Sequence, residues 1–580
     1  MRLPNLLASP RGRLAAFFFL YVTEGIPLGF AAIAVATQLR RQDVGPAQIG
    51  AFVGSFYLPW AFKWAFGPFI DVFASERLGH RRGWIIATQV LMALTLMSTV
   101  LLKLPEQLAL FTIVLLVHNS FGAMQDVAID ALAVNTLAEH ERGLANGLMF
   151  AGAAIGQAAG GAGVLFLAGV TGFQPTFFFV AGAILAVTLF VVLPMREAPS
   201  PRRHELGPSR WQTAAREMRG FAVASFRSFL GTRGAFLGLL FALLPGGAMC
   251  LGLALQSNLA VELGLDDNQV AALNLWSGII QAGFMVVGGY LSDRLGRRRT
   301  LAVYIALMSV PVAWLAMVLQ QHGWVMPVSQ TAANRPVVPD ALVLALWIAV
   351  LTYGVAVGLM YGTRSAIFMD VTNPAVAATQ FTAYMALMNL AIAYSSTWQG
   401  IAAEALGYPN TMWIDAVAGL LCLLLLPWIR TVRDNQPDGG APARARISAL
   451  VLGLACIAWL PYRLGEGAWG AATPLFETLF TVVFVASALF LLAGAAVLTH
   501  ASQTLVRAGV WMALLLFLMY LRTWSGELSG AAAQGASWLF SAVPVAAGAL
   551  LLALAAQSWR ELRLPASSAG PAPQTSASIK

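Results

Sequence analysis

The chain has 580 residues, 58% of them hydrophobic and 11% charged, and a formal net charge of +9 at pH 7. Soluble globular proteins carry about 25% charged residues, so this composition excludes a soluble core and indicates many membrane spans. A basic balance can point to nucleic acid, but here the basic residues sit in short loops between apolar runs, which membrane topology explains better. The cysteines Cys250, Cys422 and Cys456 all lie in apolar stretches without metal-ligand spacing, so we expect no disulfide, no metal site and no cofactor.

The first apolar run begins near Leu14, after Arg2, Arg11 and Arg13. It is longer than a signal-peptide core and is interrupted by Glu24, so we interpret it as an uncleaved first span with the N-terminus in the cytoplasm. Runs of this length predict twelve spans, near 14–37, 47–70, 83–103, 108–132, 143–169, 175–194, 234–258, 269–291, 301–320, 342–369, 377–404 and 408–429.

Four further apolar runs follow, near 446–464, 475–498, 508–523 and 534–556. The predicted fold is therefore an all-α polytopic membrane protein. We expect six-helix bundles over 1–194 and 234–430, a cytoplasmic central loop at 195–233, a cytoplasmic linker at 431–445 and additional transmembrane helices over 446–560. The segment 561–580 is rich in Ala, Ser and Pro, which predicts a disordered cytoplasmic tail.

The distribution of basic residues predicts the orientation of these spans. With the N-terminus inside, 27 of the 35 Lys and Arg residues fall in cytoplasmic segments. Only Arg40, Arg41, Lys103, Arg335, Arg463 and Arg522 lie on the other side, and Lys63 and Arg364 lie within spans. Because cytoplasmic loops carry the excess of positive charge, this asymmetry indicates a multi-pass protein with both termini in the cytoplasm.

The two sets of six spans also resemble each other. Gly67-Pro68-Phe69-Ile70-Asp71 follows the second span, with Arg77 and Arg81 shortly after, and Gly289 to Arg299 follows the eighth span in the tighter order Gly-Tyr-Leu-Ser-Asp-Arg-Leu-Gly-Arg-Arg-Arg. This pattern indicates a parallel internal repeat of six spans, as occurs in secondary transporters.

The loop from Gly289 to Arg298 resembles the signature of the major facilitator superfamily. Other segments resemble its peptide/acetyl-coenzyme A transporter branch, which includes the AmpG-type muropeptide permeases of bacterial inner membranes: 25–29, 59–64, 125–131, 142–147 and 373–380. The resemblance covers about residues 14 to 430 and leaves the last four spans unexplained. It implies two bundles with a central cavity, and Glu24 departs from it, standing where a small or neutral polar residue is expected.

Three charged side chains lie within the predicted N-terminal spans, at Glu24, Lys63 and Asp126. A charge inside a membrane is costly and usually faces a protein interior or a water-filled cavity. If Lys63 pairs with Asp126 or Glu24, protonation of the acid would free Lys63 for substrate and couple proton and solute movement. The alternatives are that Glu24 and Lys63 form a structural pair, or that Asp126 belongs to a gate.

Polar residues at mid-span depth are candidates for the wall of a substrate cavity: His118, Gln125, Gln157, Asn274, Gln281, Tyr384, Asn389 and Arg364. Each polar side chain could equally form hydrogen bonds between helices, and His118 could be a proton relay or a packing residue. Arg364 could hold a carboxylate or phosphate, or it could pair with Asp370 or with nearby carbonyl groups.

Acids and arginines cluster where the resemblance implies a cytoplasmic gate: Asp71, Arg77, Arg81, Asp130, Asp293, Arg294, Arg297 and Asp370. Charge-assisted hydrogen bonds between such groups can hold two helices together in one conformation and release them in another. Asp126 and Asp130 are four residues apart, so a helix would place them on one face.

The resemblance implies an inner-membrane secondary transporter that imports a bulky polar solute, anhydro-muropeptides, with protons. We expect membrane lipid around it, no nucleic acid and a monomer. A siderophore or an acyl-coenzyme A are alternative solutes, and a non-transporting sensor is a further alternative. The histidines are scattered, which disfavours a membrane enzyme, and no Gly-Lys-Ser/Thr motif lies in the soluble segments, which disfavours direct use of ATP.

Overall fold

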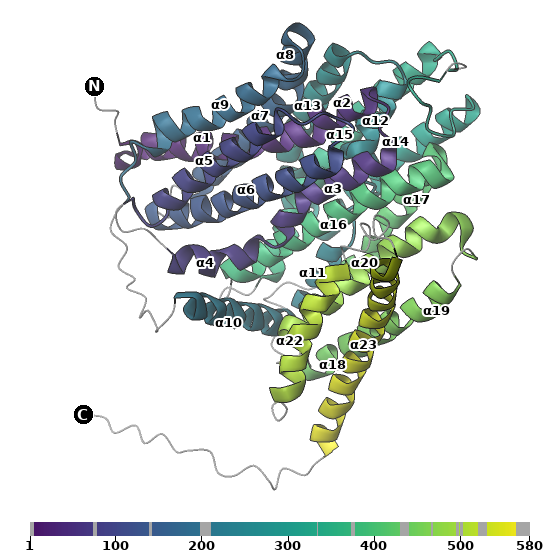
Figure 1. The fold of residues 1–580 in the computed structure, drawn as a ribbon. Coiled ribbons are helices and arrows are strands. Elements are labelled where there is room, and N and C mark those ends of the chain that lie inside the picture. The colour runs from purple at the N-terminus through teal and green to yellow at the C-terminus, as the bar shows by residue number, and fades with distance from the viewer. Residues whose placement is uncertain are drawn as a thin grey trace. The chain divides into compact units, whose positions relative to one another are not determined.

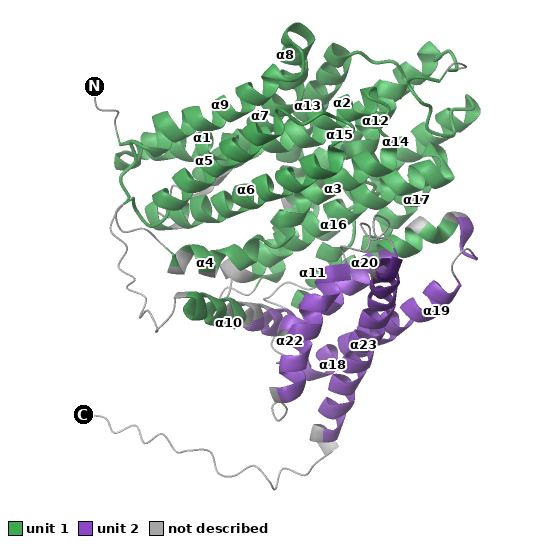
Figure 2. Ribbon diagram, in the orientation of Figure 1, with its two compact units in different colours: residues 1–221, 233–436, 471–478 green, residues 222–232, 437–470, 479–580 purple. Residues whose placement is uncertain are grey.

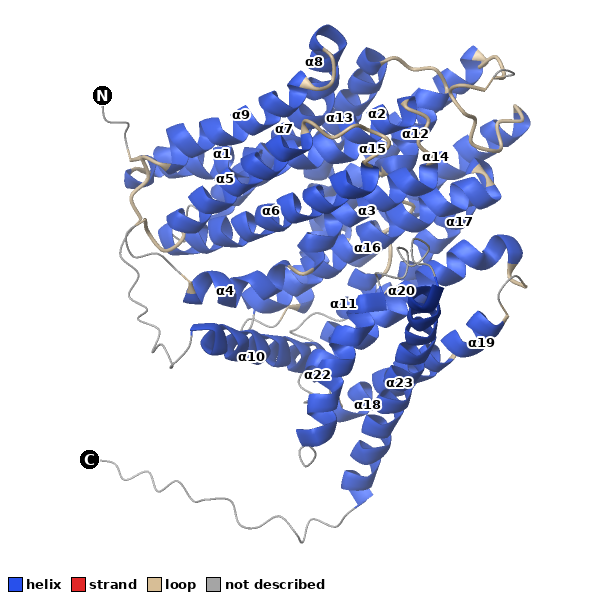
Figure 3. Cartoon of the chain, in the orientation of Figure 1, coloured by secondary structure: helices blue, strands red, loops and turns tan. Residues whose placement is uncertain are grey.

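A computed structural model describes residues 5–73, 78–137, 142–197, 210–332, 335–372, 377–429, 440–465, 468–494, 498, 503–519 and 530–563. In these ranges the secondary structure is helical, with loops and turns between the helices (Figure 3). Eleven of the described helical segments are long and apolar enough to cross a membrane. The structure confirms the predicted all-α polytopic fold.

The six predicted N-terminal spans, which we call the N-half, are all helical (Figure 1). The second span breaks after Ala61 and continues through a short 3-10 helix at Lys63–Ala65, which places Lys63 at the break. The elements are α1 Pro10–Gly29, η2 Phe30–Val35, α2 Ala36–Arg41, α3 Pro46–Ala61, η3 Lys63–Ala65, α4 Phe66–Val72, α5 Arg82–Thr99, α6 Leu108–Thr136, α7 Arg142–Ala158, η5 Ala159–Gly163, α8 Val164–Thr171, α9 Pro175–Val187 and η6 Thr188–Val192.

The next six predicted spans, which we call the C-half, follow the same plan. The seventh span differs from the continuous helix that we predicted, because it opens between Leu243 and Cys250, where Pro245, Gly246 and Gly247 disfavour helix. The elements are α11 Arg233–Leu243, η7 Cys250–Gly252, α12 Ala254–Glu262, α13 Asp267–Leu295, α14 Arg297–Gln321, α15 Asp340–Val371, α16 Ala377–Leu406, α17 Tyr408–Leu420, η9 Leu421–Leu424 and η10 Leu426–Trp428.

The predicted central loop contains a helix, α10 Arg210–Gly231. Its first turn packs through Trp211, whose ring centroid lies 5.6 Å from that of Phe69 and 4.8 Å from that of Phe73. The start of α10 therefore packs on aromatic side chains at the end of the second span.

The last predicted spans are α18 Ala441–Ile457 with α19 Trp459–Leu464, α20 Thr473–Leu489 with η13 Phe490–Gly494, α22 Gln503–Leu518 and α23 Gly530–Arg563. Most of this region forms a compact unit with residues 222–232, whereas both halves belong to the other unit (Figure 2). Trp459 is fully buried in the smaller unit, and its indole N–H donates to the Phe540 carbonyl at 2.9 Å. Residues 564–580 lie outside the described ranges.

The internal repeat is visible in the helix contacts. In the N-half, α3 packs against α6, α5 packs against α6 and α9, and α1 packs against α7. The helices six spans later repeat these contacts in the C-half. There α13 packs against α15, α14 packs against α15 and α17, and α11 packs against α16. Between the halves, α3 packs against α16 and α13 packs against α7 and α8. Replacing each helix by its equivalent in the other half turns the contact of α3 with α16 into the contact of α13 with α7. The interface between the halves therefore has the pseudo-twofold symmetry expected of a parallel repeat.

Large apolar side chains are exposed along the predicted spans. Phe150 is 65% exposed, Phe190 59%, Val310 60% and Leu344 61%. In water such a surface would carry a hydrophobic cost, whereas lipid tails solvate it without cost. The exposed apolar helices therefore support the membrane assignment independently of the helix lengths.

Small residues allow α1 and α7 to approach closely within the N-half. A Cβ at Gly152, Gly156 or Gly160 would collide with the α1 backbone at Phe18, Val22 and Ile26, respectively. The glycine repeat thus packs inside one half, as a small-residue interface typical of membrane helices.

Candidate functional site

An ion pair lies at the break in the second span. Lys63 Nζ is 2.8 Å from Asp126 Oδ2, and the side chains are only 13% and 4% exposed. Removing one partner of such a buried pair leaves an uncompensated charge, so each residue holds the other in place. The break between α3 and η3 directs Lys63 to α6, which supplies Asp126.

Two further acids accompany this pair. Glu24 on α1 is half-buried, its Oε1 is buried without a hydrogen-bond partner, and it lies within electrostatic range of Lys63, Asp126 and Asp130. Asp130, one turn from Asp126, accepts a 2.6 Å hydrogen bond from the Tyr21 hydroxyl. Three carboxyl groups thus surround one ammonium group, and we call Glu24, Lys63, Asp126 and Asp130 the acidic centre.

His118 and Gln125, both predicted cavity residues, bridge helices of the N-half instead of facing open space. His118 Nδ1 lies 2.9 Å from the Met92 carbonyl oxygen and 3.2 Å from the Thr95 hydroxyl, both on α5. Gln125 Nε2 donates to the Thr23 hydroxyl on α1 at 2.9 Å. Buried amide and imidazole groups need such partners, so the packing alternative describes both residues in this conformation.

The remaining cavity candidates separate into two groups. Tyr384 is fully buried in the C-half, where its hydroxyl donates to the Ala235 carbonyl at 3.1 Å and its ring stacks on Phe368. Asn274 is half-buried and accepts a 3.3 Å hydrogen bond from Gln256. The second group contains Gln157, Gln281 and Asn389. These side chains are half-buried, and the structure describes no side-chain hydrogen bond for them.

Arg364 occupies the C-half on α15 and is 3% exposed. Its Nη2 donates to the carbonyl oxygens of Phe241 at 3.2 Å and Leu244 at 3.0 Å, where α11 ends. Asp370, the acid considered as its partner, pairs with Arg297 instead, at 2.6 Å. Of the two structural alternatives for Arg364, the structure shows the contact with carbonyl groups.

Asp415 on α17 is a buried acid that the motifs did not single out. Its Oδ2 accepts hydrogen bonds from the backbone N–H groups of Met249 and Cys250, at 2.7 and 2.9 Å, and its Oδ1 accepts from Gln399 at 2.7 Å. Unpaired N–H groups in a broken membrane helix are costly, so Asp415 stabilises the opening in the seventh span.

For some of the predicted gate residues the structure describes contacts within one half. Arg297 and Asp370 join α14 to α15, Arg294 lies over the Tyr290 ring at 4.3 Å, and the Arg81 backbone N–H donates to Glu197 at 2.8 Å. Arg77 and the side chains of Asp71 and Asp293 lie outside the described part of the chain. The role of these residues as a gate stays a prediction.

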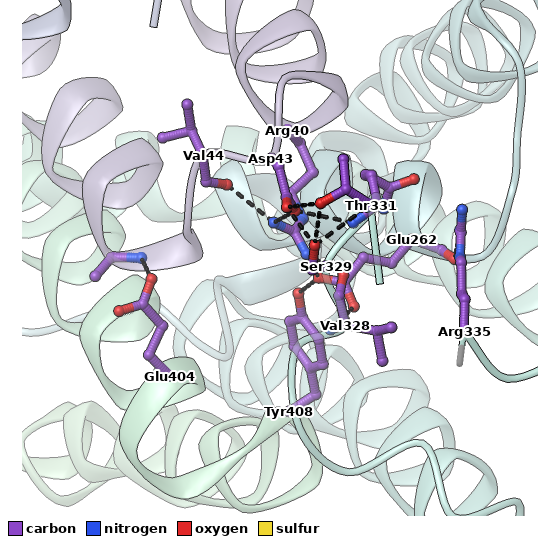
Figure 4. Close-up of polar contacts among 12 residues, drawn as sticks. Arg40, Asp43, Val44, Glu262, Val328, Ser329, Thr331, Arg335, Glu404 and Tyr408 are labelled. Atoms are coloured by element: carbon purple, nitrogen blue, oxygen red, sulfur yellow. Dashed lines mark hydrogen bonds and ion pairs between the residues drawn. The ribbon is translucent and has the colours of Figure 1, made fainter. Parts of the chain in front are cut away.

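A denser set of polar contacts joins the halves at the opposite end of the spans (Figure 4). Arg40, 2% exposed at the end of α2, donates through Nη2 to Glu262 Oε1 and to the Val328 carbonyl, both at 2.6 Å. Glu262 is itself fully buried and also accepts from the Tyr408 hydroxyl and from the Val328 N–H. Every oxygen of this buried carboxylate therefore has a donor, as a charge in a protein interior requires.

Two neighbours extend the contact. Arg41 Nε lies 2.5 Å from Asp267 Oδ1, and Asp43 accepts hydrogen bonds from the hydroxyls of Ser329 and Thr331 and from the Gln330 N–H at 2.9 Å. We call Arg40, Arg41, Asp43, Glu262 and Asp267 the Arg40 cluster. In the part of the chain that the structure describes, the hydrogen bonds and ion pairs between the N-half and the C-half gather at this end.

Close backbone approach adds to the contact at the same end. A Cβ at Gly50 on α3 would collide with the Ser396 carbonyl on α16, and the Ser396 hydroxyl donates to the Gly50 carbonyl at 3.1 Å. The Arg40 cluster and this helix contact together join the halves at the Arg40 end. From the sequence, Arg40 and Arg41 were identified only as basic residues outside the cytoplasmic segments, and their acidic partners were not predicted. The acid Glu262, which follows an apolar run, was the feature of the sequence that could have indicated such a partner.

The Asp43 contact is expected to depend on pH. Burial opposes ionisation of this carboxyl group, but the hydrogen bonds from Ser329, Gln330 and Thr331 and the charge of Arg40 together lower its pKa below the usual value. An acid with a lowered pKa stabilises the bonded state above its unperturbed pKa of about 3.9, and this stabilisation is lost as the pH falls through the lowered value.

A cysteine introduced at Val44, a buried position beside Asp43, measures this dependence. We expect Val44→Cys to be alkylated slowly and at a constant level at neutral and weakly acidic pH, after correction for the thiolate fraction of an exposed reference cysteine. The level should rise only in stronger acid, below the unperturbed pKa of Asp43. Asp43→Asn should remove that acid step, and a step that remains would show that another group titrates.

Comparisons with known proteins agree with this architecture. The sequence profile described as Major Facilitator Superfamily matches residues 14–249 and 237–564, a range that includes the last spans. The chain is 25% identical over 424 residues to the "Anhydromuropeptide permease" of Escherichia coli K12, covering 71% of this chain and 79% of that protein. It is 27% identical over 301 residues to the "Putative transporter AmpG 4" of Rickettsia conorii, covering 50% of this chain and 70% of that protein.

Solved structures show the same fold at low sequence identity. A POT family transporter in complex with 5-aminolevulinic acid superposes with a TM-score of 0.55 at 10% identity, covering 73% of this chain and 98% of that one. The D-xylose-proton symporter superposes with a TM-score of 0.53 at 13% identity, covering 71% and 96%. With its two repeated halves, its exposed apolar helices and the match of the family profile, the chain belongs to the Major Facilitator Superfamily, and it is similar to AmpG-like permeases of bacteria.

Proposed function

We propose that the chain imports anhydro-muropeptides through a passage between the N-half and the C-half, by proton-coupled alternating access. The names of the relatives support the solute class, because the E. coli protein is an anhydromuropeptide permease that matches most of this chain. The transport path is assigned to residues 1–194 and 234–430 of a single chain, with 195–233 and 431–445 in the cytoplasm and 446–560 as additional spans.

The observation that supports the mechanism is the buried contact between the halves at the Arg40 end. Arg40 and Glu262 belong to different halves, and their buried contact holds the halves together at that end. Alternating access requires a closure that can be exchanged between the two ends of a central site. The charge asymmetry assigns the Arg40 end to the periplasm, so this conformation would admit solute from the cytoplasmic side.

The acidic centre supplies the coupling group. Glu24, Asp126 and Asp130 are opposed by Lys63, and an excess of ionised acids within a membrane span is costly. A bound proton would neutralise part of this excess. Glu24 is the proposed proton carrier, since Asp126 is held by Lys63 and Asp130 by Tyr21, whereas one oxygen of Glu24 has no partner.

The test is uptake of radiolabelled anhydro-muropeptide by vesicles that carry the protein, with and without an inside-alkaline proton gradient. Accumulation that disappears when the gradient is dissipated would support the proposal. Transport of a siderophore or an acyl-coenzyme A without muropeptide would favour those solutes, and no transport of any of them would favour a sensor.

Glu24→Gln is expected to reduce gradient-driven accumulation to the level seen without a gradient, while exchange of labelled for unlabelled solute continues. The amide keeps the size of the side chain but cannot release a proton in the transport cycle. Glu106→Gln, at an exposed loop position, is the matched control and should behave as the native protein. Normal accumulation by Glu24→Gln would assign the proton to another group.

A further inference from the structure

Arg364 is a buried cation without a counter-charge among the described residues. The other cations at comparable depth are neutralised, Lys63 by Asp126 and Arg40 by Glu262. In the described ranges, no carboxylate oxygen lies within 4.0 Å of the Arg364 guanidinium, and the ionisable groups in its electrostatic range are Cys422, Tyr394 and Tyr361. A buried charge left unpaired is costly, which indicates that a partner arrives from outside the chain.

The hydrogen-bonding capacity of Arg364 is only partly used. Nη2 donates to the carbonyl oxygens of Phe241 and Leu244, but Nε is buried without an acceptor and Nη1 has no acceptor among the described residues. The rings of Phe241 and Phe368 lie 5.3 and 5.7 Å from the guanidinium carbon. Carbonyl and ring contacts attract the cation, but they do not cancel its charge.

Stabilising the end of α11 does not by itself require an arginine. The Tyr394 hydroxyl, a neutral donor, already satisfies the Leu243 carbonyl in the same turn at 2.7 Å. Neutral hydroxyl or amide groups suffice for such carbonyls and avoid the cost of burying a charge. The full charge of Arg364 is therefore more than the broken helix needs.

The guanidinium packs directly against the backbone of the opening in the seventh span. A Cβ at Gly246 would collide with Nη1 and with the guanidinium carbon, so the lack of a side chain at Gly246 allows the guanidinium to lie there. Tyr361, one turn before Arg364, is 40% exposed although it lies within electrostatic range of both Arg364 and Lys63, which belong to different halves. The exposed Tyr361 thus links the surroundings of Arg364 to those of the acidic centre.

We propose that Arg364 binds a carboxylate of the transported solute and so forms an anion subsite on the C-half, facing the acidic centre of the N-half. This inference rests on the proposed function, since the ligand is the imported solute. A peptide ends in a carboxylate, and one singly charged group neutralises one guanidinium, whereas a phosphate monoester carries about −1.5 to −2 charges at neutral pH and would leave an excess. Guanidinium donors match carboxylate geometry, and a buried site strengthens the charge-assisted hydrogen bond.

The experiment measures binding separately from transport. The purified full-length protein is heated in the presence of N-acetyl-alanine or its amide, which differ in the carboxylate. We expect the acid to raise the unfolding temperature of the native protein and the amide to leave it unchanged. In Arg364→Gln the acid should no longer protect. Gly246→Ala keeps the arginine but displaces its guanidinium, because the added Cβ would collide with Nη1, and it should weaken protection by the acid.

Arg446→Gln is the control, because Arg446 packs over the Trp559 ring within the unit of the last helices, and it should be protected as the native protein is. Equal protection by acid and amide, or protection of Arg364→Gln by the acid, would overturn the inference. Failure of muropeptide uptake together with selective protection by the acid would instead refute the proposed solute and leave the anion subsite standing.

Discussion

Arg40→Gln is expected to open the Arg40 end and to abolish most transport. The substitution removes the 2.6 Å contact with Glu262 and leaves that buried carboxylate with only the Tyr408 hydroxyl and the Val328 N–H as donors. Removing one partner of a buried ion pair costs about 3–5 kcal/mol. Since about 1.4 kcal/mol is a factor of ten, the ratio of closed to open states should fall by roughly 100-fold or more.

Alkylation of an introduced cysteine measures this change. Ser396 is 1% exposed at the contact between α16 and α3, so Ser396→Cys should resist a membrane-impermeant reagent in the native background and react readily with Arg40→Gln. The native cysteines Cys250, Cys422 and Cys456 are buried and should contribute little background.

Two comparisons make the result specific. Arg335 donates to the Glu262 main-chain carbonyl, at 2.6 Å, and not to its carboxylate, so Arg335→Gln should have a much smaller effect. Arg40→Gln combined with Glu262→Gln should recover part of the closed state, because neither charge is then left alone. If the cysteine introduced at position 396 stays protected and transport stays normal in Arg40→Gln, the Arg40 cluster does not control closure.

Lys63→Gln is expected to be the most damaging single change in the acidic centre. It leaves Glu24, Asp126 and Asp130 without the cation that lies 2.8 Å from Asp126. At a cost of about 3–5 kcal/mol for breaking a buried pair, the ratio of folded to unfolded protein should fall by roughly 100-fold or more, and the initial rate of uptake should fall with it. Asp126→Asn should be milder, because Lys63 then keeps Glu24 and Asp130 as counter-charges.

The double variant Lys63→Gln with Asp126→Asn separates folding from transport. It should restore much of the folded protein, measured by membrane abundance, without restoring accumulation against a gradient. Lys103→Gln, in a loop where the side chain is exposed, is the matched control and should be neutral. Native rates of uptake in Lys63→Gln would contradict a role for the ion pair.

Much of the acidic centre could be predicted because the membrane restricts the possibilities. A lone lysine within a span needs a partner, and Glu24 and Asp126 were the acids that the sequence predicted within neighbouring spans. The structure brings Lys63 to Asp126 at 2.8 Å and leaves Glu24 beside them. A buried charge needs a partner, and for Arg364 the sequence offered both backbone carbonyl groups and Asp370. The structure shows that Arg364 contacts the carbonyl groups, whereas Asp370 pairs with Arg297.

The sequence by itself determined the helical class, the two sets of six spans and the need for buried charges to be satisfied, because the hydrocarbon core imposes these on any chain. The pairing of Arg40 with Glu262 in the Arg40 cluster became evident only from the tertiary structure. Arg40 and Glu262 are 222 positions apart, and both end apolar runs where a charge can equally face water. The pair is buried because α2, α12 and the segment at Val328 meet there, and that meeting depends on how two repeated halves pack, which no local pattern encodes.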